Sequence, residues 1–148
     1  MNRIAIFTGI DEDEMELLRP LFKELSFQAG SVIFQQGETA EFLYLVINGT
    51  VHMSFKPYDG MPITVSHVGK NGLFGWSAVV GSEKYTSSAI AIEAVKAFRV
   101  RGSELREFCL THPEAGKVIL ERLADGVSSR WEDAHKQVKS ILLQGLKN

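Results

Sequence analysis

The sequence has one cysteine among its 148 residues, few prolines and no long apolar run. With only Cys109, an intrachain disulfide and a cysteine metal cluster are excluded. Its neighbours Phe108 and Leu110 favour a buried thiol over a redox group. No segment approaches the roughly 20 apolar residues that cross a bilayer, and the N-terminus lacks the apolar core of a secretory signal. These absences predict a cytoplasmic protein that does not contact membranes.

An excess of charge of one sign is also lacking. Lys plus Arg is 16 and Asp plus Glu is 18, so the formal net charge is −2. Proteins that coat nucleic acid are strongly basic, and this balance argues against that role. The length is close to the commonest domain size, and the hydrophobic fraction of 45% suits a packed core. We therefore predict a single domain over residues 1–148.

Residues 1–25 contain a helical pattern. Asp11 can cap the first turn, which is acidic as the helix dipole favours. Pro20 interrupts the pattern and predicts two short helices or one kinked helix. The apolar residues that recur at spacings of three and four are Met15, Leu18, Leu21, Phe22 and Leu25.

Residues 26–101 are typical of β structure, because short runs rich in Val, Ile, Phe and Thr alternate with glycines. Asn48-Gly49 favours a tight hairpin. The fold class predicted is mainly β with flanking α, an antiparallel β-roll of the double-stranded β-helix or jelly-roll type. The expected strands are Ser31–Gln35, Phe42–Ile47, Thr50–Lys56, Ile63–Val68 and Ser88–Val100.

Residues 102–148 return to the helical period. Ser103 is expected to cap a short helix that reaches about Leu110, and Pro113 to stand in the first turn of a helix running towards Leu143. A narrow heptad seam on that helix predicts a homodimer, and packing of the helix on its own barrel is the alternative. The seam consists of Leu120, Ala124, Val127, Trp131, Ala134, Val138 and Ile141.

Three strings resemble the cyclic nucleotide-binding domain of the CRP/FNR superfamily. Gly30–Gly37, GSVIFQQG, is similar to the family's G-x-x-I-x-x-x-G strand-turn-strand. Phe42–Val51, FLYLVINGTV, resembles its central hairpin. Phe74-Gly75 and the residues after it resemble the start of its phosphate-binding cassette. The resemblance covers nearly all of the chain and implies a β-roll that senses a ligand and regulates a partner.

The cassette implied by the resemblance has a physical purpose. A phosphate needs backbone N–H groups that converge at a helix start, and Gly75 lets a ligand approach the backbone. Hydroxyls further along the chain add donors. The implied ligand is a cyclic nucleotide or another small anion, with no resident cofactor. The implied ligand-binding residues are Phe74, Gly75, Trp76, Ser77, Ala78, Lys84, Tyr85, Thr86, Ser87 and Ser88.

Two cassette positions depart from the family pattern. Trp76 stands where the family has a glutamate that accepts from the ribose 2′-hydroxyl. Tyr85, beside Lys84, stands where the family has an arginine that pairs with the phosphate. Charge-assisted bonds are worth roughly 1.5–3 kcal/mol each, so their loss predicts weak cAMP binding. Trp76 either stacks on a planar ligand or fills the vacated pocket, and Tyr85 either donates to an anion or covers the mouth.

The leading interpretation is a stand-alone sensor without enzymatic activity, because no Ser-centred elbow, P-loop or G-x-G-x-x-G occurs. The alternatives are an adaptor or dimerisation domain with a filled pocket that binds protein, and a fragment of a CRP/FNR-type transcription regulator. No helix-turn-helix fits after Ile141, so direct DNA binding is not expected.

A metal site is not expected either. None of the four histidines shows a close metal-ligand spacing. His52 and His67 lie on strands that can approach one another, but the acidic ligands of the related metal-binding barrels are missing.

Overall fold

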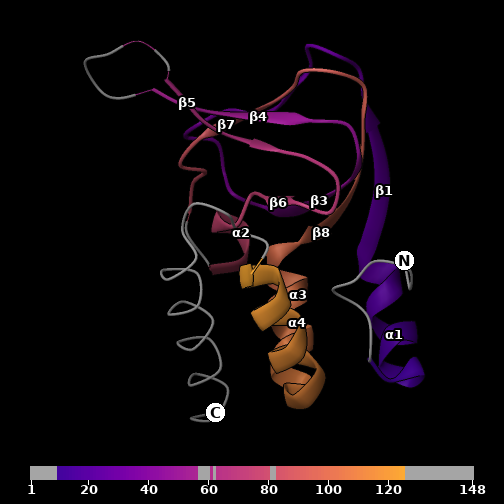
Figure 1. Cartoon of the computed structure of the whole chain (residues 1–148). Coiled ribbons are helices and arrows are strands. Elements are labelled where there is room, and N and C mark those ends of the chain that lie inside the picture. Colours follow the sequence, from indigo (N-terminus) through magenta and orange to yellow (C-terminus); the bar gives the residue numbers. More distant parts are fainter. Residues whose placement is uncertain (1–9, 57–60, 62, 81–82, 126–148) are drawn as a thin grey trace.

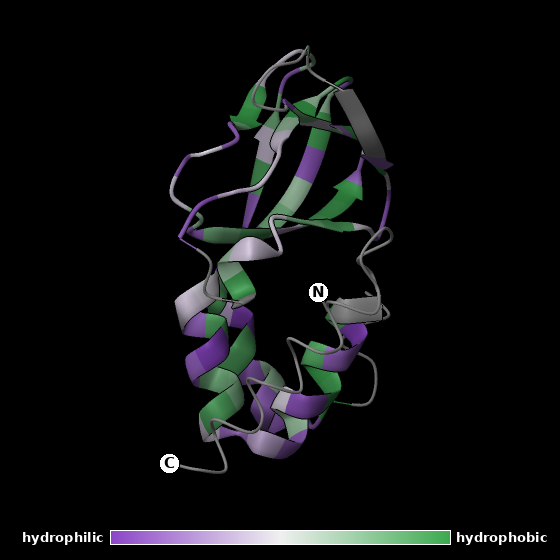
Figure 2. Ribbon diagram, turned by 90° about the vertical axis from the view of Figure 1, so that its left-hand side faces the viewer, coloured by the Kyte–Doolittle hydropathy of each residue, from purple (hydrophilic) through white to green (hydrophobic). Residues whose placement is uncertain are grey.

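The computed structural model describes residues 10–56, 61, 63–80 and 83–125 (Figure 1). A β-roll forms one end of the molecule, and helices lie together at the other (Figures 1 and 2). No helix in this part of the chain is long and apolar enough to cross a bilayer. The helical elements are α1 (Glu12–Leu18), η2 (Arg19–Leu21), α2 (Ser77–Val80), α3 (Gly102–Thr111) and α4 (Pro113–Asp125).

Two four-stranded sheets make the roll, with strand orders β1-β8-β3-β6 and β2-β7-β4-β5. Their strand pairs are antiparallel, so the predicted antiparallel β-roll with flanking helices is confirmed. The strand predicted over Ser88–Val100 divides into two, one in each sheet. The strands are β1 (Phe22–Phe27), β2 (Val32–Phe34), β3 (Phe42–Asn48), β4 (Val51–Phe55), β5 (Ile63–Val68), β6 (Leu73–Phe74), β7 (Ser88–Ala91) and β8 (Val95–Arg101).

The N-terminal segment differs from its prediction after Leu18. Asp11 caps α1, its carboxylate accepting from the Asp13 N–H at 3.2 Å. The helical pattern was expected to reach residue 25, but the chain passes through a 3₁₀ turn at Pro20 and then enters β1. All six residues of β1 pair with β8. This ladder provides hydrogen-bond partners for the backbone N–H and C=O groups of β1. A helix over the same residues would already be interrupted by Pro20, so the strand is favoured.

The start of α3 also differs from its prediction. Arg101, not Ser103, is the N-cap, and no side chain caps the helix. Gly102 faces the carbonyl of Ala78 so closely that a Cβ there would collide with it. The contact between α2 and the start of α3 therefore needs glycine, and this determines where the helix begins. Pro113 opens α4, as predicted.

The dimer seam is wrong at its first position. Leu120 is 0% exposed within its own domain, where it packs with Ile119 and Leu123 of the same helix. A side chain buried in this way cannot contact a second copy, so α4 up to this point follows the alternative of packing on its own barrel. Ala124 lies on the last turn of α4. The seam positions outside the described residues are Val127, Trp131, Ala134, Val138 and Ile141.

Two cores lie on the two faces of β3, because successive side chains of a strand point to opposite faces. Leu43 and Leu45 join the helix-side core, which unites the sheet with α1, α3 and α4. Tyr44 and Val46 join the roll core, between the two sheets. The other aromatic side chains buried in the roll core are Phe34, Phe74 and Tyr85.

Candidate ligand site at the cassette

The cassette begins where β6 ends and turns at Gly75. This residue has φ +83°, and a Cβ there would lie 2.7 Å from the carbonyl oxygen of Phe42. Its own carbonyl accepts from the Ala78 N–H at 3.1 Å, which starts the single turn of α2. Only glycine combines this backbone conformation with so close an approach. The turn thereby holds the main chain of the cassette against the first residue of β3.

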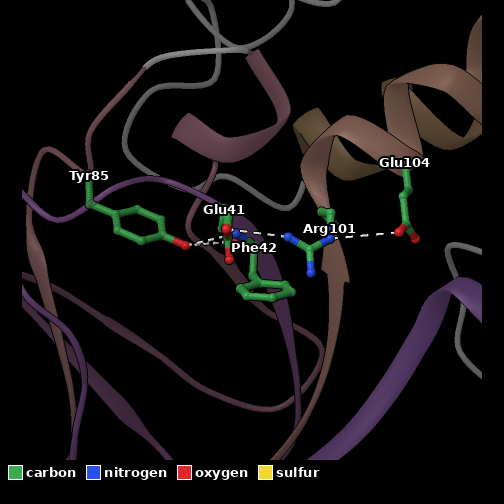
Figure 3. Close-up of polar contacts among 5 residues, drawn as sticks. All are labelled: Glu41, Phe42, Tyr85, Arg101 and Glu104. Atoms are coloured by element: carbon green, nitrogen blue, oxygen red, sulfur yellow. Dashed lines mark hydrogen bonds and ion pairs between the residues drawn. The ribbon is translucent and has the colours of Figure 1, made fainter.

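Tyr85 points into the roll core. Its ring stacks on Phe34 with centroids 3.6 Å apart and planes 10° apart. Its hydroxyl donates to the Phe42 carbonyl at 2.7 Å and accepts from the Phe42 N–H at 3.0 Å (Figure 3). Burial raises the pKa of Tyr85 to about 12. The ring of Tyr85 is buried and its hydroxyl has partners within the chain, so this arrangement favours neither of its expected roles, an anion donor or a cover over the mouth.

The backbone beside Tyr85 is also fixed. Its N–H donates to the Glu38 carbonyl and its carbonyl accepts from the Gly37 N–H, both at 2.9 Å. Lys84, one residue earlier, pairs with Thr39 in an isolated bridge and its side chain is exposed. The ammonium group of Lys84 and the exposed Thr86 are therefore accessible to a ligand, whereas the Tyr85 hydroxyl is not.

Trp76 is half-buried and packs against the helix-side core. Its two expected roles, stacking on a planar ligand and filling the vacated pocket, stay predictions. Ser88 is directed away from the cassette turn. Its hydroxyl oxygen accepts from the Gln36 N–H at 2.9 Å, and it lines a groove with Val32, Lys56 and others.

The remaining expected residues divide by exposure. Phe74 and Ala78 are buried, and Ser77 and Ser87 are half-buried. The sequence-predicted residues therefore differ in their accessibility to a ligand. The structure brings together the turn at Gly75, Phe74 and Tyr85 around the start of β3, and leaves Lys84 and Thr86 at the surface.

Two arginines that are not among the expected site residues lie next to this turn. The guanidinium carbons of Arg99 and Arg101 lie 4.1 Å and 5.0 Å from the centroid of the Phe42 ring. They come from β8, whose register sets Arg101 opposite Phe42 and Arg99 opposite Tyr44. Arg99 and Arg101 follow Val95 and Ala97 at two-residue intervals, and this period could have placed them on the same face of the strand.

The charges of these arginines are partly balanced. Arg101 pairs with Glu41 at 3.3 Å and with Glu104 at 3.7 Å (Figure 3). Burial raises the pKa of Tyr44, while a hydrogen bond and the charge of Arg99 lower it. A mixed network of cations, carboxylates and aromatic rings thus surrounds the backbone of Phe42, to which the Tyr85 hydroxyl is hydrogen-bonded.

Comparison with known proteins identifies the family. The model of the cyclic nucleotide-binding domain matches residues 24–112, which is more than half of the chain. The chain belongs to the family of cyclic nucleotide-binding domains.

Several relatives have names that describe regulators. A CRP-like cAMP-activated global transcriptional regulator of Mycobacterium tuberculosis is 28% identical over 84% of this chain and 55% of its own length. A global nitrogen regulator of Synechococcus elongatus is 30% identical over 78% of this chain and 51% of its own length. The chain thus spans about half the length of these relatives.

Solved structures support the same fold. The catabolite activator protein of Thermus thermophilus superposes with a TM-score of 0.70 at 23% identity, over 92% of this chain and 62% of that one. A cyclic nucleotide-binding domain from Methylobacillus flagellatus reaches a TM-score of 0.74 at 16% identity, over 94% of this chain and 78% of that one.

Proposed function

We propose that this chain is a cytoplasmic, non-catalytic regulatory domain that does not recognise cAMP through the charged contacts typical of its family. One observation carries the proposal. Tyr85, which aligns with the phosphate-pairing arginine of the resemblance, is committed to the roll core through Phe34 and both polar groups of the Phe42 peptide. A side chain fixed in this way supplies neither a charge nor a donor to a nucleotide phosphate.

The ribose contact is weakened for a separate reason. Trp76 replaces a carboxylate and its ring packs against the helix-side core. Two charge-assisted contacts at roughly 1.5–3 kcal/mol each amount to about 3–6 kcal/mol. Because about 1.4 kcal/mol is a factor of ten, a micromolar site becomes millimolar or weaker.

The cassette keeps features that suit another small anion. The Gly75 turn exposes no side chain of its own, and Lys84 and Thr86 are exposed at the adjoining segment. A lysine acts as a point charge with less geometric selectivity than an arginine. We therefore propose a small anionic ligand of different shape from cAMP, held mainly by backbone N–H groups.

Calorimetry on the full chain tests this function. Wild-type protein is titrated with cAMP and cGMP, beside Trp76→Glu and the matched control Trp76→Phe. We expect wild type and the control to bind neither nucleotide more tightly than millimolar. Trp76→Glu should show a measurable gain in affinity. Tyr85→Arg is unsuitable as a second test variant, because it would bury a charge in the roll core. Micromolar binding of either nucleotide by wild type would overturn the proposal.

A second candidate is an adaptor that binds only protein. It is favoured by the aromatic packing of the roll, where Tyr44 stacks on Phe74 at 4.8 Å and Tyr85 on Phe34. In this case the C-terminal helices would form a homodimer through the seam positions that follow Asp125. A thermal-shift screen with cyclic nucleotides and other small anions separates the two, because a ligand of the native state raises the melting temperature. A flat response from wild type and Trp76→Glu alike would favour the adaptor.

A further inference from the structure

Two histidines face each other across neighbouring strands of the roll. His52 on β4 is the direct register partner of His67 on β5. Their sequence neighbours Val51 and Val68 belong to the roll core, so both imidazoles lie on the outer face of the sheet. His67 is exposed and His52 is half-buried, which leaves the pair accessible from solvent.

The spacing of the two rings suits a shared metal ion. Their centroids are 4.7 Å apart and their planes are inclined by 53°. With a metal–nitrogen bond of about 2.0–2.1 Å, an ion lies roughly 3.2 Å from the centroid of each imidazole. Two such rings at a bond angle of about 95–110° have centroids about 4.7–5.2 Å apart. The centroid separation of the observed pair falls within this range.

The side chains next to the pair in the rows of the sheet are mostly neutral, although Lys56 lines a groove with Ser88 and Ile90. The next residue in the same row across the sheet is Ile90 on β7, and beyond it Val32 on β2. The adjacent row pairs Ser54 with Ser88. These side chains are neutral. Because β4 pairs with both β5 and β7, the backbone that carries His52 is held from two sides.

We propose that His52 and His67 form a two-histidine site for a divalent transition-metal ion of the zinc, nickel or copper type. Imidazole nitrogen suits these ions, and water would complete the coordination. No group of three or more His, Cys, Asp or Glu side chains suited to a metal gathers among the described residues, which supply the two histidines as ligands of this site. The site lies outside the cassette and does not depend on the proposed function.

The test uses the full chain without a histidine tag and zinc chloride as the probe. We expect one saturable zinc ion by calorimetry, with chelator reversal. In long-range ¹H–¹⁵N spectra of the imidazoles, the signals of His52 and His67 should change together. His52→Asn and His67→Asn should each weaken zinc binding at least tenfold. His112→Asn is the matched control and should keep wild-type affinity, because His112 lies at the C-cap of α3.

The proposal is overturned if the spectra show no change of these two signals at millimolar zinc. It is also overturned if His67→Asn binds zinc as tightly as wild type, or if the zinc-dependent change follows His112 or His135 instead. His67 is exposed, so its replacement keeps the fold and provides a valid comparison even where His52→Asn does not. In each of these outcomes the two rings are a tilted cross-strand pair without a metal.

Discussion

The two cores of this domain share one strand and differ in chemistry. The helix-side core is almost wholly aliphatic, with leucines from β3, α3 and α4 that are at most 2% exposed. The roll core combines four buried aromatic rings with valines and alanines, and two of the rings carry a hydroxyl. Aliphatic packing has no preferred direction, whereas Tyr85 must meet Phe42 at a set distance and angle. The helix-side core therefore provides stability, and the roll core also determines geometry.

This difference affects how the cassette can change. In the helix-side core, a leucine can be exchanged for a side chain of similar volume at small cost. At Tyr85, any exchange alters the stacking on Phe34 and the two hydrogen bonds to Phe42 together. Ligand specificity and fold stability are thus coupled at one residue. A return to a charged phosphate partner would need compensating changes in the roll core.

The largest effect we expect is from Leu120→Ala. Leu120 is 0% exposed in the helix-side core, so its truncation should lower the free energy of unfolding by about 2–5 kcal/mol in urea denaturation. Leu110→Ala is the control, because Leu110 is 39% exposed, and it should change the same quantity by less than about 1 kcal/mol. If the two substitutions lowered the free energy of unfolding equally, α4 would not pack on its own barrel. Leu120 would then again be a candidate for the dimer seam.

A smaller effect is expected from Tyr85→Phe. The ring and its stacking on Phe34 are kept, but the peptide of Phe42 loses both partners. Leaving such groups unpaired should lower the free energy of unfolding by about 1–3 kcal/mol. Tyr85→Leu, which also removes the stacking, should cost more. If Tyr85→Phe were neutral, the hydroxyl would have no structural role, and its availability to a ligand would have to be reconsidered.

Much of the fold was predictable from local patterns. The positions of β3, β4 and β5 follow from glycine-punctuated apolar runs, and Asn48-Gly49 stands at the end of β3, where the chain turns into β4. The resemblance extended these patterns to the family, which the comparison confirmed. β1 was missed because its residues also fit a helical spacing, and only the pairing with β8 decides between the two.

The candidate site was predictable only in part, because orientation is a tertiary property. Phe74-Gly75 identified the turn, but nothing local shows that Tyr85 points inward. Leu120 fits a heptad seam and a barrel-facing stripe equally well, since both place apolar residues at spacings of three and four. His52 and His67 are far apart in the chain, and only the register of β4 and β5 makes them neighbours.

The smallest effect concerns pH, and it distinguishes the two cores by the pH at which each loses stability. Burial raises the pKa of Cys109, in the helix-side core, from 9.0 to about 12, and that of Tyr85, in the roll core, from 10.0 to about 12. In both cases the unfolded chain releases its proton first as the pH rises. Stability from each group is therefore complete below its unfolded pKa and decreases above it.

The free energy of unfolding in urea should accordingly stay flat between pH 7 and about pH 8.5 and begin to fall near pH 9. Cys109→Ala should delay the fall to about pH 10, because the thiol is the group with the lower unfolded value. Tyr85→Phe should leave the onset near pH 9 and reduce the slope above pH 10. If Cys109→Ala and wild type lost stability in parallel from pH 9, the thiol would be no less solvated in the folded chain than in the unfolded one. The helix-side core would then admit water beside α3, and its difference from the roll core would be smaller than the packing indicates.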